Sequence, residues 1–146
     1  MTIKQASIRD IDELAVLFAQ YRVFYRQTFD TEAAKQFLLE RITNRESVIF
    51  IAIDAGQTAG FTQLYPSFSS VSMRKIWILN DLFVSAEHRR KGIAQALINE
   101  VAGYCKKTGR NRVVLSTAYD NFNAQKLYEK LGFNRSDFYN YELEIA

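Results

Sequence analysis

The sequence predicts an α/β fold of the α+β kind, in which helices flank a mixed, mostly antiparallel sheet. Three observations lead to this fold class. Apolar residues of the 146-residue chain recur at helical spacing in some segments and at strand spacing in others. The short turn at 54–57 joins two strand-like runs into an antiparallel hairpin. Between residues 75 and 117, a strand, a helix and a second strand form a unit that demands a parallel crossover.

The first half of the chain alternates strands with helices. Acidic residues in its first turn mark a helix that starts at Asp10, and Asp30 or Thr31 can cap the next helix. The serine-rich stretch 66–72 is turn-like. The expected elements are a strand at 3–8, helices from residue 10 and over 31–41, and hairpin strands at 47–53 and 58–65.

The second half contains the crossover. A run that is apolar on both faces at 75–84 predicts a central strand. The C-terminal run alternates apolar with polar residues, which is typical of an edge strand. The expected elements are strand 75–84, helix 92–107, strand 112–117, helix 123–131 and edge strand 138–145. No linker or repeat interrupts this order, so one domain is expected to span residues 1–146.

The stretch 89–94, Arg-Arg-Lys-Gly-Ile-Ala, has the character of a pyrophosphate site. Gly92 lets the backbone approach a ligand without a Cβ in the way, and the free N–H groups that open the following helix can converge on an anion. Arg89, Arg90 and Lys91 add charged donors at the same place. The alternative is a solvated basic helix start after a strand.

A second segment, 121–133, forms a short helix in this reading. Asn121 or Asn123 can cap its N-terminus, and Gly132 stands where a left-handed residue ends a helix. Tyr128 lies on the apolar face and therefore points toward the body of the domain. Its alternative role is that of a core tyrosine with a satisfied hydroxyl.

Together these two segments resemble the GNAT superfamily of acetyl-CoA-dependent N-acetyltransferases. The first is similar to its Arg/Gln-x-x-Gly-x-Gly/Ala motif, and the second to its Asn-x-x-Ala-x-x-Leu-Tyr-x-x-x-Gly-Phe segment. The stretches 63–67 and 77–84 look like the histone/polyamine acetyltransferase-like branch. The resemblance implies the GNAT fold, with a splayed parallel strand pair at the acyl-CoA site, and transfer of an acetyl group from acetyl-CoA to a primary amine.

The same resemblance implies roles for individual residues. It gives Tyr128 the part of general acid toward the leaving thiolate, which suits a phenol with an ordinary pKa near 10. Asn123 would contact the pantetheine arm, with helix capping as its alternative. The implied cofactor-binding residues are Leu82, Phe83 and Val84 through their backbone, Arg89, Arg90, Lys91, Gly92, Ile93 and Ala94 around the pyrophosphate, and Asn123.

The acceptor amine is expected near Asp81. A carboxylate inside an apolar central strand needs a cationic or hydrogen-bonding partner, and a substrate ammonium would be one. Asp81 is therefore a candidate base or anchor, although Asn80, an arginine or backbone N–H groups are alternative partners. Tyr25, Tyr65 and Trp77 are the candidate substrate-binding rings. Phe18 and Tyr21 are expected in the core, and His88 at the surface or packed in a loop.

Composition narrows the remaining possibilities. One cysteine, Cys105, suits a reducing compartment, and no signal-like or membrane-spanning run appears, so a cytoplasmic protein is expected. The net charge of +3 favours an anionic, phosphate-rich ligand over nucleic acid, because exposed aromatic residues do not interleave the basic patch. No metal site is expected. The aromatic edge strand predicts a homodimer.

Direct, ternary-complex transfer to a polyamine, a lysine-bearing peptide or another small amine is thus the first hypothesis. The alternatives are a non-catalytic acyl-CoA sensor or protein-interaction module, and a basic nucleic-acid-binding domain. The nucleic-acid reading rests on charge alone.

Overall fold

The computed structural model describes residues 1–145, which fall into two compact units that divide between Ser116 and Thr117. Each unit is described by itself. The first unit contains all five strands, and the second contains one helix. Whether both belong to a single domain spanning residues 1–146 stays a prediction.

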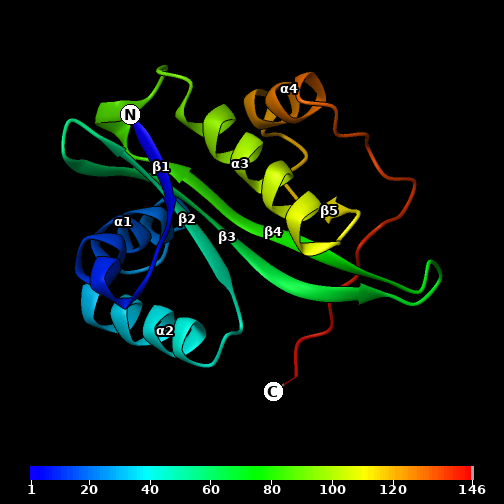
Figure 1. Cartoon of the computed structure of the whole chain (residues 1–146), viewed down its shortest axis with the longest axis horizontal. Coiled ribbons are helices and arrows are strands. Elements are labelled where there is room, and N and C mark those ends of the chain that lie inside the picture. The colour runs from blue at the N-terminus through cyan, green and yellow to red at the C-terminus, as the bar shows by residue number, and fades with distance from the viewer. Residues whose placement is uncertain (146) are drawn as a thin grey trace. The chain divides into compact units, whose positions relative to one another are not determined.

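The first unit is built on a mixed sheet with the strand order β1-β2-β3-β4-β5 (Figure 1). All neighbouring strands are antiparallel except β4 and β5, which are parallel. The strands are β1 (Thr2–Gln5), β2 (Val48–Asp54), β3 (Gln57–Ser69), β4 (Arg74–Val84) and β5 (Val113–Val114). The predicted fold class is confirmed, as are the hairpin and the parallel crossover. The strand at 75–84 was expected to be central, but β3 is the central strand, and within residues 1–145 β4 is paired on both sides only at Trp77 and Ile78.

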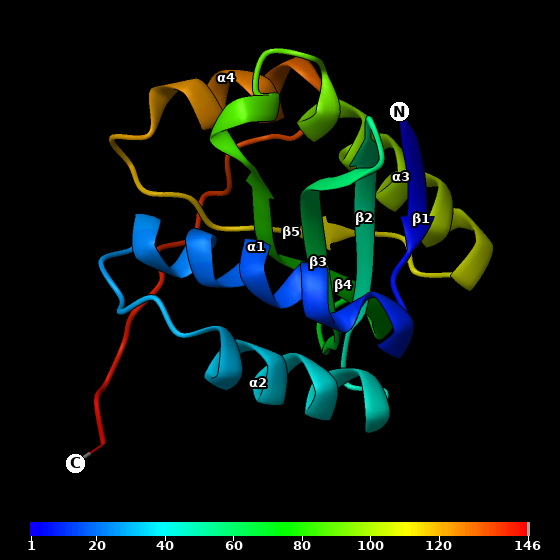
Figure 2. The ribbon, with the colours of Figure 1, turned by 90° about the vertical axis from the view of Figure 1, so that its left-hand side faces the viewer.

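Helices cover both faces of this sheet. Figure 2 shows α1 (Ile11–Phe24) and α2 (Thr31–Thr43) along one face, and α3 (Ile93–Thr108) packs on the other. The core between α1, α2 and the sheet includes Leu14, Phe18, Leu38, Ile51 and Phe61. On the opposite face, the side chains that fill the space include Phe50, Trp77, Leu97, Val101 and Tyr104.

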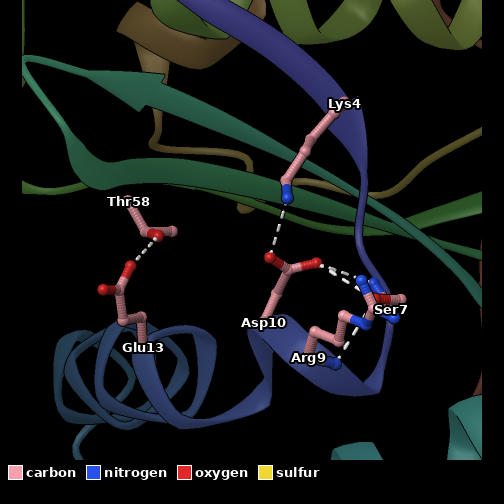
Figure 3. A network of polar contacts seen from close by, with 6 residues as sticks. All are labelled: Lys4, Ser7, Arg9, Asp10, Glu13 and Thr58. Atoms are coloured by element: carbon pink, nitrogen blue, oxygen red, sulfur yellow. Dashed lines mark hydrogen bonds and ion pairs between the residues drawn. The ribbon is translucent and has the colours of Figure 1, made fainter.

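A capping box sets where the 3-10 helix Ile8–Asp10, which leads into α1, begins. The backbone N–H of Ser7 donates to Asp10 Oδ2 at 2.9 Å, and Lys4 Nζ lies 2.9 Å from Asp10 Oδ1 (Figure 3). Thr58 Oγ1 on β3 donates to Glu13 Oε2 on α1 at 2.8 Å. The strand predicted at 3–8 therefore ends at Gln5, because the chain turns into this cap. The predicted cap of α2 is confirmed at Asp30, whose Oδ1 accepts from the Ala33 N–H at 3.0 Å.

An irregularity in the pairing of β3 with β4 decides which side chains share a face. Gln63 is opposite Asp81 and Leu64 is opposite Leu79, so Asn80 is an extra residue on β4. Such a bulge breaks the two-residue alternation of the strand. Asp81 consequently lies on the face that α1 and α2 cover. Leu79 and Trp77, which uninterrupted alternation would put on the same face as Asp81, lie on the α3 face instead.

The start of α3 lies close to the sheet because β3 has a glycine there. A Cβ on Gly60 would lie 3.0 Å from Phe83 O and 3.1 Å from Ile93 Cγ2. No larger residue fits this approach without displacing its neighbours. Gly60 therefore brings the first residue of α3 against the end of β4.

Two loop predictions are corrected by the hairpin and the crossover. The serine-rich stretch 66–72 was expected to be a turn, but β3 continues to Ser69 because Pro66 to Ser69 pair with β4. The strand expected at 112–117 is reduced to Val113–Val114, since its pairing with β4 covers two residues.

The second unit contains α4 (Phe122–Lys130). The strand predicted at 138–145 is wrong: no strand is assigned there, and the side chains of Phe138, Tyr139, Tyr141, Leu143 and Ile145 are 83–92% exposed. An alternating apolar pattern becomes a strand only where another strand supplies hydrogen bonds, and this unit has none between residues 117 and 145. Within residues 1–145, no helix has the length and apolar character needed to span a bilayer.

Candidate active site

The loop between β4 and α3 has the conformation of an anion site. Arg90 has a φ of 66° and Gly92 a φ of 77°, with Lys91 between them outside the left-handed region. Backbone that alternates in this way turns consecutive N–H groups toward one side. Gly92 is also the N-cap of α3, and no side chain caps this end. The first N–H groups of α3 and its positive dipole end are thereby open to a phosphate.

The basic side chains of this loop are arranged differently from one another. Arg89 Nε donates to Val84 O at 3.1 Å, and its guanidinium lies 5.7 Å from the Phe83 ring centroid. Lys91 Nζ lies 3.0 Å from Asp54 Oδ2, and this contact lowers the pKa of Asp54. Arg90 is exposed. Arg89 thus contacts the end of β4, while the exposed side chain of Arg90 can reach a bound anion.

A 3-10 helix, Ala86–His88, lies between the end of β4 and the anion loop. The Ser85 N–H donates to Ala59 O at 2.8 Å, and Ser85 Oγ lies 2.8 Å from His88 Nδ1. His88 is buried. Of the two predicted positions for His88, at the surface or packed in a loop, the structure shows the second.

The end of β4 is paired on one side. β5 meets β4 at Trp77 and Ile78, so from Leu79 onward the β5 side of this strand has no pairing partner within residues 1–145. Leu82, Phe83 and Val84 are half-buried along this stretch. This is the splayed parallel pair that the fold class predicted, and it leaves backbone groups beside the anion loop open to a ligand.

Asp81 is a buried carboxylate held by neutral donors. It is 5% exposed. Gln63 Nε2 donates to its Oδ2 at 2.7 Å, Asn80 Nδ2 donates to its Oδ1 at 3.1 Å, and the Tyr21 hydroxyl also hydrogen-bonds to it. No lysine, arginine or histidine within residues 1–145 forms an ion pair with it. Burial raises the pKa of Asp81, and these three donors oppose the rise.

Two tyrosines respond to this carboxylate. Burial and then the charge of Asp81 raise the pKa of Tyr21 well above its usual value. The same two causes raise the pKa of Tyr65 to about 12, and Arg41 opposes the rise. The Tyr21 ring packs against Phe61 and Phe83 at centroid distances of 5.5 and 5.7 Å. Both hydroxyls therefore stay protonated near neutral pH and can act as hydrogen-bond donors.

Sequence reasoning missed two members of this group. Tyr21 was expected in the core, but it also reaches Asp81. Gln63 was noted only as part of a resemblance to a family branch, although a fully buried amide in an apolar strand is the same kind of signal as Asp81. Because the pairing register was unknown, nothing in the sequence joined the two.

The three predicted substrate rings are not brought together. Tyr65 lies on the Asp81 face, and Tyr25 is 55% exposed with its ring 5.2 Å from Tyr21. Trp77 is 5% exposed on the α3 face, where Nε1 donates to Thr108 Oγ1 at 3.3 Å. The bulge at Asn80 is the reason, since uninterrupted alternation would have put Trp77 and Asp81 on one face. Trp77 is therefore left out of the acceptor site proposed below.

The remaining two predicted residues lie in the second unit, on α4. Asn121 Oδ1 accepts from the Ala124 N–H at 3.3 Å, so Asn121 and not Asn123 is the cap. Asn123 is exposed. Tyr128 is half-buried, with its ring 5.7 Å from Phe133.

Comparison with known proteins decides the family. Residues 13–133 match the family model of the Acetyltransferase (GNAT) family. The chain belongs to this family. The uncharacterized N-acetyltransferase YhfO of Bacillus subtilis strain 168 is 45% identical over 146 residues, which are 99% of this chain and 98% of that protein. A probable acetyltransferase of Haemophilus influenzae is 33% identical over 134 residues, which are 91% of this chain and 90% of that protein.

A solved structure described as a probable acetyltransferase has the same fold as this GNAT chain. The two superpose with a TM-score of 0.93 at 42% identity, and the match covers 100% of this chain and 99% of the other. The resemblance drawn from the two motifs is thus confirmed at the level of the family, and the chain is an enzyme of an acetyltransferase family. The narrower likeness to the histone/polyamine branch goes beyond what these names state.

The buried carboxylate of this GNAT enzyme predicts a pH-dependent stability. The raised pKa of Asp81 adds stability below the ordinary value of 3.8, and that stability is lost as the pH rises through the raised value. We expect Asp81→Asn to become steadily more stable relative to the wild type as the pH rises above the ordinary value of 3.8, until Asp81 is ionised in the folded state as well, as measured by thermal unfolding. Glu144→Gln, at an exposed carboxylate, is the control. A difference between Asp81→Asn and wild type that stays constant over this range would contradict the assigned shift.

Proposed function

We propose that this chain transfers an acetyl group from acetyl-CoA to a primary amine in a ternary complex. The observation that carries the proposal is Asp81, a buried carboxylate without a cationic partner in residues 1–145. It lies three residues before Val84, about 10 Å along the strand, on the approach to the anion loop. A site for a positive group and a site for a negative one are therefore built on the same strand end.

The residues of the loop fit a pyrophosphate. The alternating backbone at Arg90 and Gly92, the uncapped start of α3 and the exposed Arg90 side chain all favour phosphate oxygens. A Cβ at residue 92 would meet no atom within 4 Å, so the glycine there is not needed for packing within the chain. Ile93 and Ala94 would contribute their backbone N–H groups. When bound, acetyl-CoA supplies an activated acetyl group.

Each step of the transfer has a candidate group. Asp81 holds the acceptor ammonium and takes its proton, since a buried carboxyl with a raised pKa is a better base than an exposed one. The backbone N–H groups of Leu82 and Val84 face the unpaired side of β4 and orient the acetyl carbonyl. The N–H of Phe83, between them, points toward β3, so Phe83 would line the site by its position alone. Tyr128 donates its hydroxyl proton to the departing sulfur, and Asn123 contacts the pantetheine arm.

The acceptor class follows from the same site. A polyamine, a lysine-bearing peptide or another small primary amine has the ammonium that Asp81 requires. Tyr25, whose ring packs 5.2 Å from Tyr21, and Tyr65, whose pKa Asp81 raises, are the proposed substrate-binding rings. We further propose that the enzyme acts in the cytoplasm as a homodimer. The predicted edge strand is not formed, so the support for a dimer is the exposed apolar side chains of residues 138–145, and light scattering at micromolar concentration would test it. The histone/polyamine branch stays a prediction.

Substitution of the two glycines at the ends of α3 can distinguish an effect on cofactor binding from an effect of backbone strain. Gly92 and Gly109 have nearly the same left-handed conformation, with φ of 77° and 71°, and a Cβ would meet nothing within 4 Å at either. We expect Gly92→Ala and Gly109→Ala to lose similar stability, about 1 kcal/mol each. Only Gly92→Ala should weaken acetyl-CoA binding in calorimetry, by about tenfold or more. Equal acetyl-CoA affinities for the two variants would contradict the assignment of the pyrophosphate site to this loop.

The function itself is tested by release of free thiol from acetyl-CoA in the presence of polyamines, amino acids, aminoglycosides and lysine-rich peptides. We expect turnover with one amine class, and a kcat at least about 100-fold lower in Tyr128→Phe, because a general acid contributes that much. Tyr119→Phe, at an exposed tyrosine of the same unit, is the control.

Two results would count against this account. A Tyr128→Phe variant with the kcat of the wild type would exclude the general-acid role. Tight acetyl-CoA binding without turnover of any amine would favour the sensor alternative.

A further inference from the structure

We propose that Gln63 is a second binding group for the acceptor: its Oε1 and the Asp81 carboxylate accept hydrogen bonds from the same primary ammonium. Its Nε2 meanwhile positions the carboxylate. This inference rests on the proposed function, because it concerns the ammonium that Asp81 is proposed to bind.

The two side chains are held next to each other by the sheet. Gln63 on β3 is directly opposite Asp81 on β4, and the pair lies at the point where the bulge begins. Gln63 is fully buried, and its Nε2 donates to Asp81 Oδ2 at 2.7 Å. Its Oε1 is buried and has no hydrogen-bond partner within residues 1–145.

The orientation of the amide is fixed by its neighbour. If the Gln63 amide were turned over, Oε1 would face the oxygens of Asp81, and two acceptors at that distance repel each other when the carboxylate is ionised. Nε2 must therefore face Asp81, and Oε1 is the atom left over. A buried amide oxygen without a donor destabilises the fold, and a ligand that supplies the donor would remove that cost.

Asp81 has room for one more donor. A carboxylate offers about four lone-pair positions. Gln63, Asn80 and Tyr21 occupy three of these positions. This count leaves one lone-pair position on Asp81. Gln63 Oε1, on the amide that bonds to Asp81 Oδ2, is a second acceptor without a donor within residues 1–145. Both can accept from one positively charged donor group.

A primary ammonium can donate to Gln63 Oε1 and to Asp81 at the same time. It carries three N–H donors and one positive charge, so it can bond to Gln63 Oε1, bond to Asp81 and neutralise the buried carboxylate. A hydroxyl has one donor and no charge, and a quaternary ammonium has charge but no donor. The Gln63 and Asp81 pair should therefore select primary amines over alcohols and over trimethylated amines.

Binding of n-butylammonium, followed by NMR chemical-shift titration, tests this pair without requiring turnover. Wild type should bind n-butylammonium and reject butyltrimethylammonium. Gln63→Met keeps the length of the side chain but removes both the Oε1 acceptor and the Nε2 donor to Asp81 Oδ2. It should therefore weaken n-butylammonium binding by roughly 10- to 100-fold, the loss expected for a hydrogen bond to a charged group. Gln57→Met, the same change at an exposed position of β3, should bind as wild type does.

Two further variants separate the possible failures. Gln63→Glu restores an oxygen acceptor in the same shape, and because the two adjacent carboxyl groups share a proton, binding should return close to the wild-type level. This variant also guards against a Gln63→Met protein that folds poorly, which thermal unfolding would reveal. Asp81→Asn should abolish binding.

The outcomes distinguish the inference from the function on which it rests. Loss of binding in Asp81→Asn with full binding in Gln63→Met would overturn the role of Gln63 and leave the ammonium site of Asp81 standing. Equal binding by wild type and Asp81→Asn, or no binding by wild type, would overturn the ammonium site and the role of Gln63 with it.

Discussion

The pairing of β3 with β4 is the constraint on which the candidate site depends. One extra residue, Asn80, interrupts the ladder and changes the face to which the following residues belong. Thr62 Oγ1 donates to Asp81 O at 2.8 Å and so satisfies a carbonyl at the irregular point of the ladder. Asp81 is thereby fixed on the α1 and α2 face opposite Gln63, while Leu79 and Trp77 pack toward α3.

The same strand end separates two kinds of electrostatic environment. Toward the core, Asp81 is surrounded by neutral donors and by tyrosines whose pKa values it raises, so its negative charge has no protein cation to balance it within residues 1–145. Toward α3, the backbone at Arg90 and Gly92 and the helix dipole present positive charge. The proposed transfer needs this separation, because the proposed acceptor is a cation and acetyl-CoA carries phosphates.

Close packing holds the two environments in register. Gly60 lets Ile93 approach the sheet, and Arg89 bonds to Val84 O from the loop. The start of α3 therefore contacts the last residues of β4. A side chain larger than that of glycine at residue 60 would prevent this approach. Tyr21 ties α1 to the same region through Phe61, Phe83 and Asp81.

Local patterns predicted much of this arrangement. The anion loop, the Asp30 cap and the parallel crossover depend on neighbours in sequence, and a sequence can display those. Asp81 was recognisable because a carboxylate in an apolar strand is unusual. The roles of Gln63 and Tyr21, and the separation of Trp77 from Asp81, depend on a bulge that no local pattern announced. The C-terminal run failed as a strand because alternation predicts which face is apolar but cannot supply a partner strand.

The central claim is that one strand end holds a cationic acceptor and an anionic donor at separate, defined groups. A crystal structure with CoA and n-butylamine bound tests it most directly. The account predicts the pyrophosphate at the N–H groups of residues 92–94, and the amine nitrogen within hydrogen-bonding distance of both Asp81 and Gln63 Oε1. A pyrophosphate bound elsewhere, or an amine placed away from Asp81, would contradict it.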